Sequence, residues 1–138
     1  MTTVQSFYDA IDTLAPFSTQ AGFDNSGLLA GSMRQPVQRA LVALDCSTAV
    51  TEEAIRLGCQ LIVSHHPLIF DPLRALTPEN PLYLLAKHDI ALISTHTPWD
   101  KAPLGVNHVL YALLRAPLGL HGDPVLLEDG FGMACAAE

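Results

Sequence analysis

Residues 39–67 read RALVALDCSTAVTEEAIRLGCQLIVSHHP, and this stretch decides the fold. Two short apolar runs, 40–44 and 61–63, have the length of buried strands. The segment between them, 48–57, has apolar residues on one side and acidic residues near its start, and Gly58 follows it as a helix terminator. A strand, a helix and a second strand in this order predict parallel strands joined by a right-handed crossover.

The same alternation continues toward the carboxyl end. A short helical stripe over 82–86 precedes a third apolar run, 90–93, and a helical pattern over 103–115 comes after it. The predicted order is therefore strand, helix, strand, helix, strand, helix. The tail over 117–138 is predicted to be irregular, and an edge strand around Met133 is the one regular element that it could supply.

The amino-terminal part carries a different pattern. Residues 4–14 have apolar positions at helical spacing and predict an amphipathic helix, whereas 18–38 are polar and glycine-containing and predict mostly loop. We therefore predict one α/β domain over residues 1–138, with three layers and a mostly parallel sheet flanked by helices.

Composition narrows the class of protein. The 138 residues are 49% hydrophobic and 15% charged, which fits one globular domain rather than a disordered chain. The formal net charge of -7 disfavours nucleic acid as a partner, because a phosphate backbone would be repelled. No apolar run approaches the roughly 20 residues that cross a bilayer, and the start of the chain lacks the pattern of a signal peptide. The three cysteines are an odd set with no close pair in the sequence, so we expect a cytoplasmic protein.

Polar side chains that could bind metal follow two of the predicted strands. His65 and His66 end the second strand, and Asp100 lies beyond the third. Successive side chains of an extended segment point in opposite directions, so two adjacent histidines reach two metal ions more easily than one. Asp100 is the candidate bridge between such ions. Paired metals about 3.5 to 4 Å apart activate water for displacement reactions, so the pattern predicts a dinuclear centre with hydrolase chemistry.

Simpler interpretations of these residues remain open. The two histidines could be hydrogen-bonded loop residues without a metal, and Asp100 could cap a helix or pair with Lys101. His96 could bind metal directly, but we favour a supporting role beside the ligands. Asp45 could orient a ligand histidine or cap the following helix. No residue is assigned as catalytic.

Several segments resemble one known family in order along the chain. Residues 23–31, 61–70, 94–100 and 105–107 are similar to the amino-terminal half of the Nif-three-like family, whose members are labelled GTP cyclohydrolase 1 type 2 homologs. The resemblance implies the α/β fold, a dinuclear metal centre and assembly into ring-like homo-oligomeric hexamers. It also implies that His65, His66 and Asp100 are metal ligands.

This sequence departs from the family pattern in three ways. Pro98 replaces an asparagine and His108 an acidic residue, which changes the hydrogen bonding near the site. The family also has a carboxyl-terminal half that supplies another histidine and a glutamate, and the sequence ends where that half would begin. We expect an amino-terminal fragment. Alternatively, another chain completes the site, or the site holds fewer metals.

These observations lead to an expected function. We expect a metal-binding protein that holds divalent ions, two by resemblance, and the ligand types do not distinguish among zinc, iron, manganese and nickel. Metal-activated water would hydrolyse a small-molecule substrate that the sequence does not identify, and GTP enters by resemblance alone. The alternatives are a non-catalytic metal-binding scaffold or regulatory subunit, and a metal-free interaction module.

Overall fold

A four-stranded sheet forms the centre of the protein, whose computed structural model describes residues 1–137. The strands lie in the order β1 (Gly27–Ala30), β4 (Ala91–Ser94), β3 (Leu61–Ser64) and β2 (Ala40–Ala43). The last three run parallel, whereas β1 pairs antiparallel with β4 at the edge. The three strands predicted from apolar runs are confirmed, and the sheet is mostly parallel.

Strand β1 shows that the prediction of mostly loop over 18–38 is wrong in part. This strand has four residues, and the φ angles of Gly27 at its start and Gly31 just beyond its end are 126° and 88°. Glycine adopts such angles readily, and the same two glycines make a short apolar run look like a turn in the sequence. A 3-10 helix, η1 (Phe17–Thr19), lies in the same segment.

The two crossover helices form where the sequence predicts them. Helix α2 (Thr48–Leu57) joins β2 to β3, and α3 (Pro81–Lys87) precedes β4. At the start of α2, the Ser47 hydroxyl accepts a hydrogen bond from the backbone N–H of Val50. Gly58 ends this helix in the left-handed conformation, with a φ of 64°.

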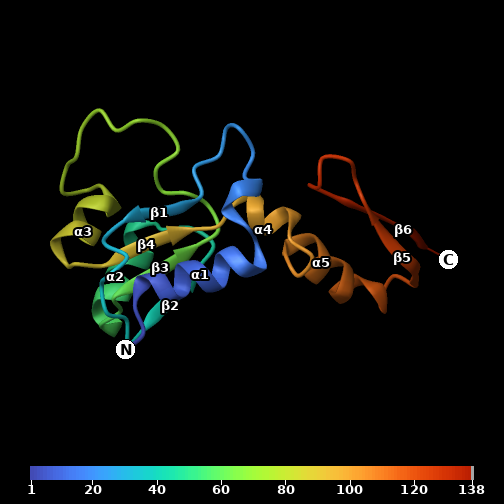
Figure 1. Cartoon of the computed structure of the whole chain (residues 1–138), viewed down its shortest axis with the longest axis horizontal. Helices are drawn as coiled ribbons and strands as arrows, with labels where there is room; N and C mark the ends of the chain where they lie inside the picture. Colours follow the sequence, from blue (N-terminus) through green and yellow to red (C-terminus); the bar gives the residue numbers. More distant parts are fainter. Residues whose placement is uncertain (138) are drawn as a thin grey trace.

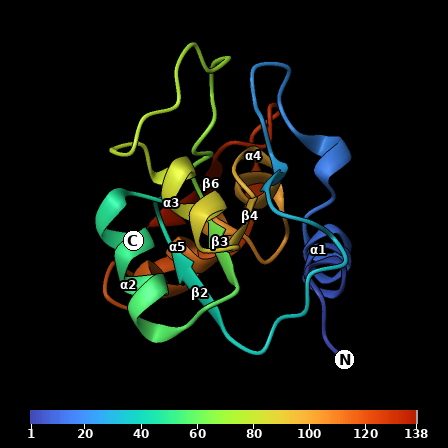
Figure 2. The same ribbon diagram turned by 90° about the vertical axis from the view of Figure 1, so that its left-hand side faces the viewer.

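Helices cover both faces of the sheet, which gives three layers. Helix α1 (Val4–Leu14) lies on one face and α2 on the other (Figure 2). Side chains alternate along the strands, so Leu61 and Ile93 pack toward α1, while Ile62 and Leu92 pack in the cluster that α2 and α3 complete. The three-layer α/β architecture is therefore confirmed.

The carboxyl-terminal part projects from this layered body (Figure 1). Helix α4 (Thr97–Lys101) was not predicted, and α5 (Val106–Arg115) begins three residues inside the helical pattern over 103–115. The strand expected around Met133 is present as β6 (Met133–Ala137), but the rest of the tail is not irregular, because β5 (Leu120–Leu126) pairs with β6 as an antiparallel hairpin. The glycine, aspartate and proline inside β5, together with its register shift, conceal this strand in the sequence.

Helix α5 carries an apolar face that stays exposed. None of its residues is buried, and Leu113 is 69% exposed. The homo-oligomer suggested by resemblance stays a prediction. Among residues 1–137, no helix combines the length and the apolar character needed to cross a bilayer.

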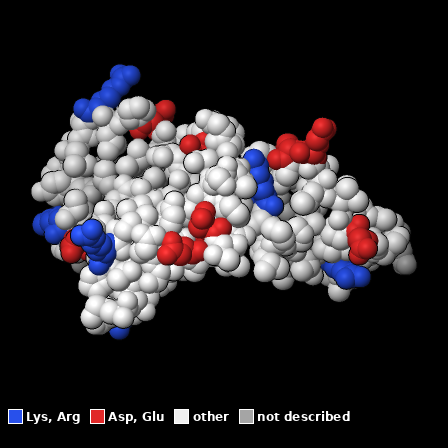
Figure 3. All heavy atoms as spheres, viewed as in Figure 1, with Lys and Arg blue, Asp and Glu red and all other residues white. Residues whose placement is uncertain are grey.

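Charged side chains are sparse on the visible surface. On the face drawn in Figure 3, the Lys and Arg side chains stand apart from one another and form no continuous basic patch. The net charge of the whole chain is -7. A polyanion would find neither a basic patch on this face nor a favourable average field.

We expect the substitution Leu92→Ala to destabilise the protein by about 3 kcal/mol, because it leaves a cavity among fully buried side chains. The matched control is Leu113→Ala on the exposed face of α5, for which we expect a change below about 1 kcal/mol. Urea unfolding followed by circular dichroism measures both. Equal losses for the two variants would contradict the core described above.

Candidate metal centre

Three imidazoles meet at the carboxyl ends of β3 and β4. His65 and His66 directly follow β3, and His96 lies two residues beyond β4. Each ring offers one nitrogen atom such that the three nitrogens all lie within 4.8 Å of one another. The strands are parallel neighbours with Ser64 opposite Ser94, so their ends open at the same edge of the sheet. We call these three residues the histidine cluster, and it could hold a metal ion.

Asp100 lies beside this cluster. Its Oδ1 is 3.5 Å from Nε2 of His65, and the two side chains are 21% and 18% exposed. Helix α4 carries Asp100 in its first turn. The side-chain amide of Asn107 donates a hydrogen bond to the backbone carbonyl oxygen of Asp100 at 2.9 Å. The structure thus brings together His65, His66 and Asp100, the three residues predicted to bind metal. Their role as ligands stays a prediction.

Gly105 fixes how closely α5 approaches the short helix that bears Asp100. A Cβ atom at this position would lie 1.7 Å from the carbonyl oxygen of Trp99, so only glycine fits. The next helix begins immediately after it and places Asn107 against Asp100. The Gly-Val-Asn motif of the sequence therefore holds the backbone of the candidate ligand in place.

Asp45 orients one of the cluster histidines. Its Oδ1 lies 2.6 Å from Nδ1 of His66, and Ser47 rather than Asp45 caps the following helix. An ionised carboxylate can only accept, so Nδ1 carries the proton in this contact, and in the neutral ring the lone pair lies on Nε2. A carboxylate behind a histidine is the usual support of a metal-ligating imidazole. The geometry therefore favours the orienting role that the sequence left open for Asp45.

Asp24 supports His96 in the same way, and sequence reasoning did not assign it this role. Its side chain is fully buried, with Oδ1 3.2 Å from Nδ1 of His96. Its other oxygen accepts hydrogen bonds from the backbone N–H of Thr97 at 3.0 Å and the hydroxyl of Ser26 at 2.9 Å. The backbone N–H of Asp24 also closes a turn with the carbonyl of Ala21. Its contact with His96 depends on tertiary structure, and no local motif signals it.

The ionisation of Asp24 follows from these contacts. Burial alone would raise the pKa of this carboxyl group, but the hydrogen bonds from Thr97, Ser26 and His96 outweigh burial and lower it below its ordinary value of 3.8. Asp24 is therefore negatively charged at neutral pH. A charged acceptor holds the His96 ring more firmly than a neutral one would.

His65 is the most enclosed ring of the cluster. Burial lowers its pKa, the Asp100 carboxylate raises it in part, and the neighbouring His66 and His96 lower it further, so the net shift is downward. His65 also lines an apolar recess of about 240 Å³, together with side chains of α1, β2 and β3. The neutral form that results is the form that binds metal.

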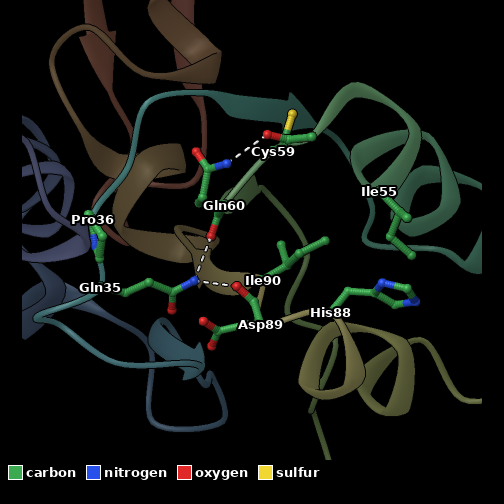
Figure 4. A pocket seen from close by; sticks show the side chains of 9 residues that line it. Gln35, Pro36, Ile55, Cys59, Gln60, His88, Asp89 and Ile90 are labelled. Carbon is green, nitrogen blue, oxygen red and sulfur yellow. Dashed lines mark hydrogen bonds between the residues drawn. The ribbon is translucent and has the colours of Figure 1, made fainter.

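A different pocket lies at the opposite end of the parallel strands, next to the residues that precede β3 and β4. It has a volume of about 300 Å³ and is drawn in Figure 4. The Gln35 side-chain amide donates to the backbone carbonyls of Gln60 and Asp89 and so ties the starts of the two strands together. His88 also lines this pocket. In the part of the chain that the structure describes, the one close group of three metal-binding side chains is the histidine cluster.

Comparison with known sequences gives a consistent match. The sequence model of the family described as Duf34/NIF3 (NGG1p interacting factor 3) matches residues 2–134. A relative named GTP cyclohydrolase 1 type 2 homolog, from Clostridium perfringens, is 38% identical over 128 residues, which are 88% of this chain and 49% of the relative. A second relative with the same name, from Staphylococcus aureus, is 44% identical over 103 residues, which are 72% of this chain and 28% of that relative. The chain thus spans about half or less of these relatives and matches their amino-terminal part.

Solved structures show the same fold. The crystal structure of Staphylococcus aureus protein SA1388 is similar with a TM-score of 0.82 and 36% identity, covering 91% of this chain and 36% of that one. Reduced HcgD from Methanocaldococcus jannaschii is similar with a TM-score of 0.83 and 31% identity, covering 94% of this chain and 51% of that one.

The substitution Asp24→Asn tests the support of His96. The pKa of Asp24 is lowered in the folded protein, so its charge stabilises the fold above the ordinary value of 3.8, and this contribution is lost as the pH falls through the lower folded-state pKa. We expect the free energy of unfolding of the variant to be about 2 kcal/mol lower at pH 7. It should also depend less on pH in the acid range than that of the native chain.

The measurement is the free energy of unfolding in urea at pH 7 and pH 3. Asp123→Asn removes one exposed negative charge and serves as the control. If the free energies of unfolding of the two variants change with pH in the same way, the buried Asp24 carboxylate does not stabilise the fold through its charge.

Proposed function

The chain belongs to the Duf34/NIF3 family, the Nif-three-like family that its motifs resemble, and from this membership we propose that it supplies metal ligands for a hydrolase. His65, His66 and Asp100 bind divalent ions in this proposal, and His96 is a further ligand. One observation carries it: three imidazoles and a carboxylate converge at one sheet edge, and two of the imidazoles are backed by carboxylates of their own.

The residues present fit a metal site. Imidazole and carboxylate donors suit zinc, iron, manganese or nickel. His65, His66 and His96 would hold an ion together, and Asp100 beside His65 would add a fourth donor; further positions would be left to water or to other ligands. We propose two ions, because the family resemblance implies a dinuclear centre, and the close approach of the three imidazoles fits at least one of them.

The chain's own side chains prepare the donors. Asp45 and Asp24 keep a proton on Nδ1 of His66 and His96, so Nε2 of each ring stays free to bind metal. Desolvation keeps His65 neutral. A pocket of about 360 Å³ opens beside His66 and gives a small molecule access. A bound divalent ion supplies a water molecule whose pKa is lowered toward neutrality, which suits attack on an electrophilic carbon or phosphorus.

The name of the relatives points to GTP as the first substrate to test. Their name is GTP cyclohydrolase 1 type 2 homolog, and this chain spans about half or less of their length. The sequence contains no glycine-rich phosphate loop, so recognition of a triphosphate would depend on other groups. We therefore propose the reaction class, hydrolysis, and leave the substrate to experiment.

Metal binding is tested with the double variant His65→Ala, His66→Ala. We expect the native chain to retain zinc, manganese or iron after dialysis, and the variant to bind at least tenfold more weakly, because two of the four donors are gone. Elemental analysis and a zinc titration measure this. His88→Ala with His121→Ala removes two exposed histidines outside the cluster and should leave metal content unchanged. Equal metal content in both double variants would remove the proposal.

Hydrolysis is tested by Asp100→Ala. We expect metal-supplemented native protein to turn over GTP or a generic phosphodiester, and the variant to fall to the rate of metal in buffer, because a ligand beside His65 is lost. Product formation is followed by chromatography. Metal binding without turnover of any such substrate would favour the non-catalytic scaffold.

A further inference from the structure

Two exposed phenylalanine rings lie beside the histidine cluster. Phe23 belongs to the loop before β1, and Phe70 to the segment that follows His66. Their ring centroids are 6.3 Å apart and their planes are inclined by 28°, so the rings lie side by side in a stacked arrangement. They are 62% and 48% exposed. We call them the aromatic pair.

The aromatic pair continues directly into the histidine cluster. The ring of Phe70 meets the imidazole of His96 at a centroid distance of 6.1 Å and an angle of 75°, an edge-to-face contact. His96 in turn meets His65 at 5.2 Å and His66 at 5.6 Å. A series of ring contacts therefore links the exposed aromatic pair to the imidazoles proposed to bind metal.

Hydrogen bonds hold the two loops together under these rings. The side-chain amide of Asn25 donates to the backbone carbonyl of Ile69 at 2.7 Å, one residue before Phe70. Asp24, the residue that follows Phe23, is fixed by its buried carboxylate, which accepts a hydrogen bond from the backbone N–H of Thr97 and contacts His96. The Asp24 carboxylate thus fixes the residue next to Phe23 and also orients His96, whereas the Asn25 hydrogen bond fixes the segment next to Phe70. About half of Phe70 and more than half of Phe23 stay exposed.

We propose that the aromatic pair is a stacking surface for a flat aromatic or heteroaromatic ring of the substrate. An aromatic ring gains most from an offset or edge contact with another ring, and stacking accepts any flat ring because every such ring has a π-face. A substrate ring that stacks on Phe70 brings its polar substituents toward His96 and the cluster. This inference deepens the proposed function, because it names the chemical class of the substrate.

The geometry favours a small molecule over a macromolecular partner. The pair joins a cluster of polar ligand atoms, so one ligand would present a flat apolar face and a polar group close together. A heteroaromatic ring that carries carbonyl, hydroxyl or phosphate groups has this combination. An apolar protein segment would cover the rings but would leave the imidazoles without a partner.

The test measures ring binding separately from metal binding. Adenosine, uridine and ribose are titrated into the whole chain, with and without added zinc, and binding is followed by ligand-observed NMR. We expect adenosine to bind more tightly than uridine because its ring is larger, and ribose not to bind. In the double variant Phe23→Leu, Phe70→Leu, adenosine affinity should fall about tenfold, or about 1.4 kcal/mol.

Leucine keeps an apolar side chain but removes the flat ring. Since both rings are largely exposed, thermal unfolding and zinc content of the double variant should match those of the native chain. Phe131→Leu replaces another exposed phenylalanine, in the turn between β5 and β6, and should leave adenosine affinity unchanged.

The outcomes separate this inference from the proposed function. Equal adenosine affinity in the native chain and the Phe23, Phe70 double variant overturns the stacking surface, whether or not zinc binds. Equal binding of ribose and adenosine, or no adenosine binding at millimolar concentration, overturns it as well. If adenosine stacks but zinc does not bind, the metal proposal fails while the stacking surface stands.

Discussion

The parallel pairing of β3 with β4 is the constraint on which the site depends. Ser64 lies opposite Ser94, and their buried hydroxyls are 2.7 Å apart, so the two strands end at one level. The Ser64 hydroxyl also donates to the backbone carbonyl of His66 at 2.9 Å. A slip of one residue in either strand would turn the following side chains to the other face of the sheet. The meeting of imidazoles from two segments is therefore a consequence of strand register.

Carboxylates from three other parts of the chain complete this arrangement. Asp24 comes from the loop before β1, Asp45 from the end of β2 and Asp100 from α4, and each lies beside a different histidine. Only Asp24 is fully buried, and it alone satisfies several donors at once. The site thus combines a rigid side, built on a buried polar network, with a more open side at Asp45 and His66.

Sequence periodicity identified the three parallel strands and the helices between them, because each has an uninterrupted apolar pattern. It missed β1, which begins at a glycine and pairs with a strand more than 60 residues away, and β5, which contains glycine, aspartate and proline. His65, His66 and Asp100 could be found because they follow strands and match a family motif. The role of Asp24 could not, since its contacts with Thr97 and His96 span more than 70 residues and depend on tertiary structure.

The projecting arrangement of α5 and its hairpin has a dynamic consequence. Helix α5 contacts α4, β5 and β6 and buries none of its own residues, whereas the strands around the histidines lie in the closed core. Local opening costs least where few apolar contacts must break. The α5 and hairpin unit should therefore exchange its amide hydrogens as a separate cooperative unit, while the sheet edge that bears the imidazoles stays closed.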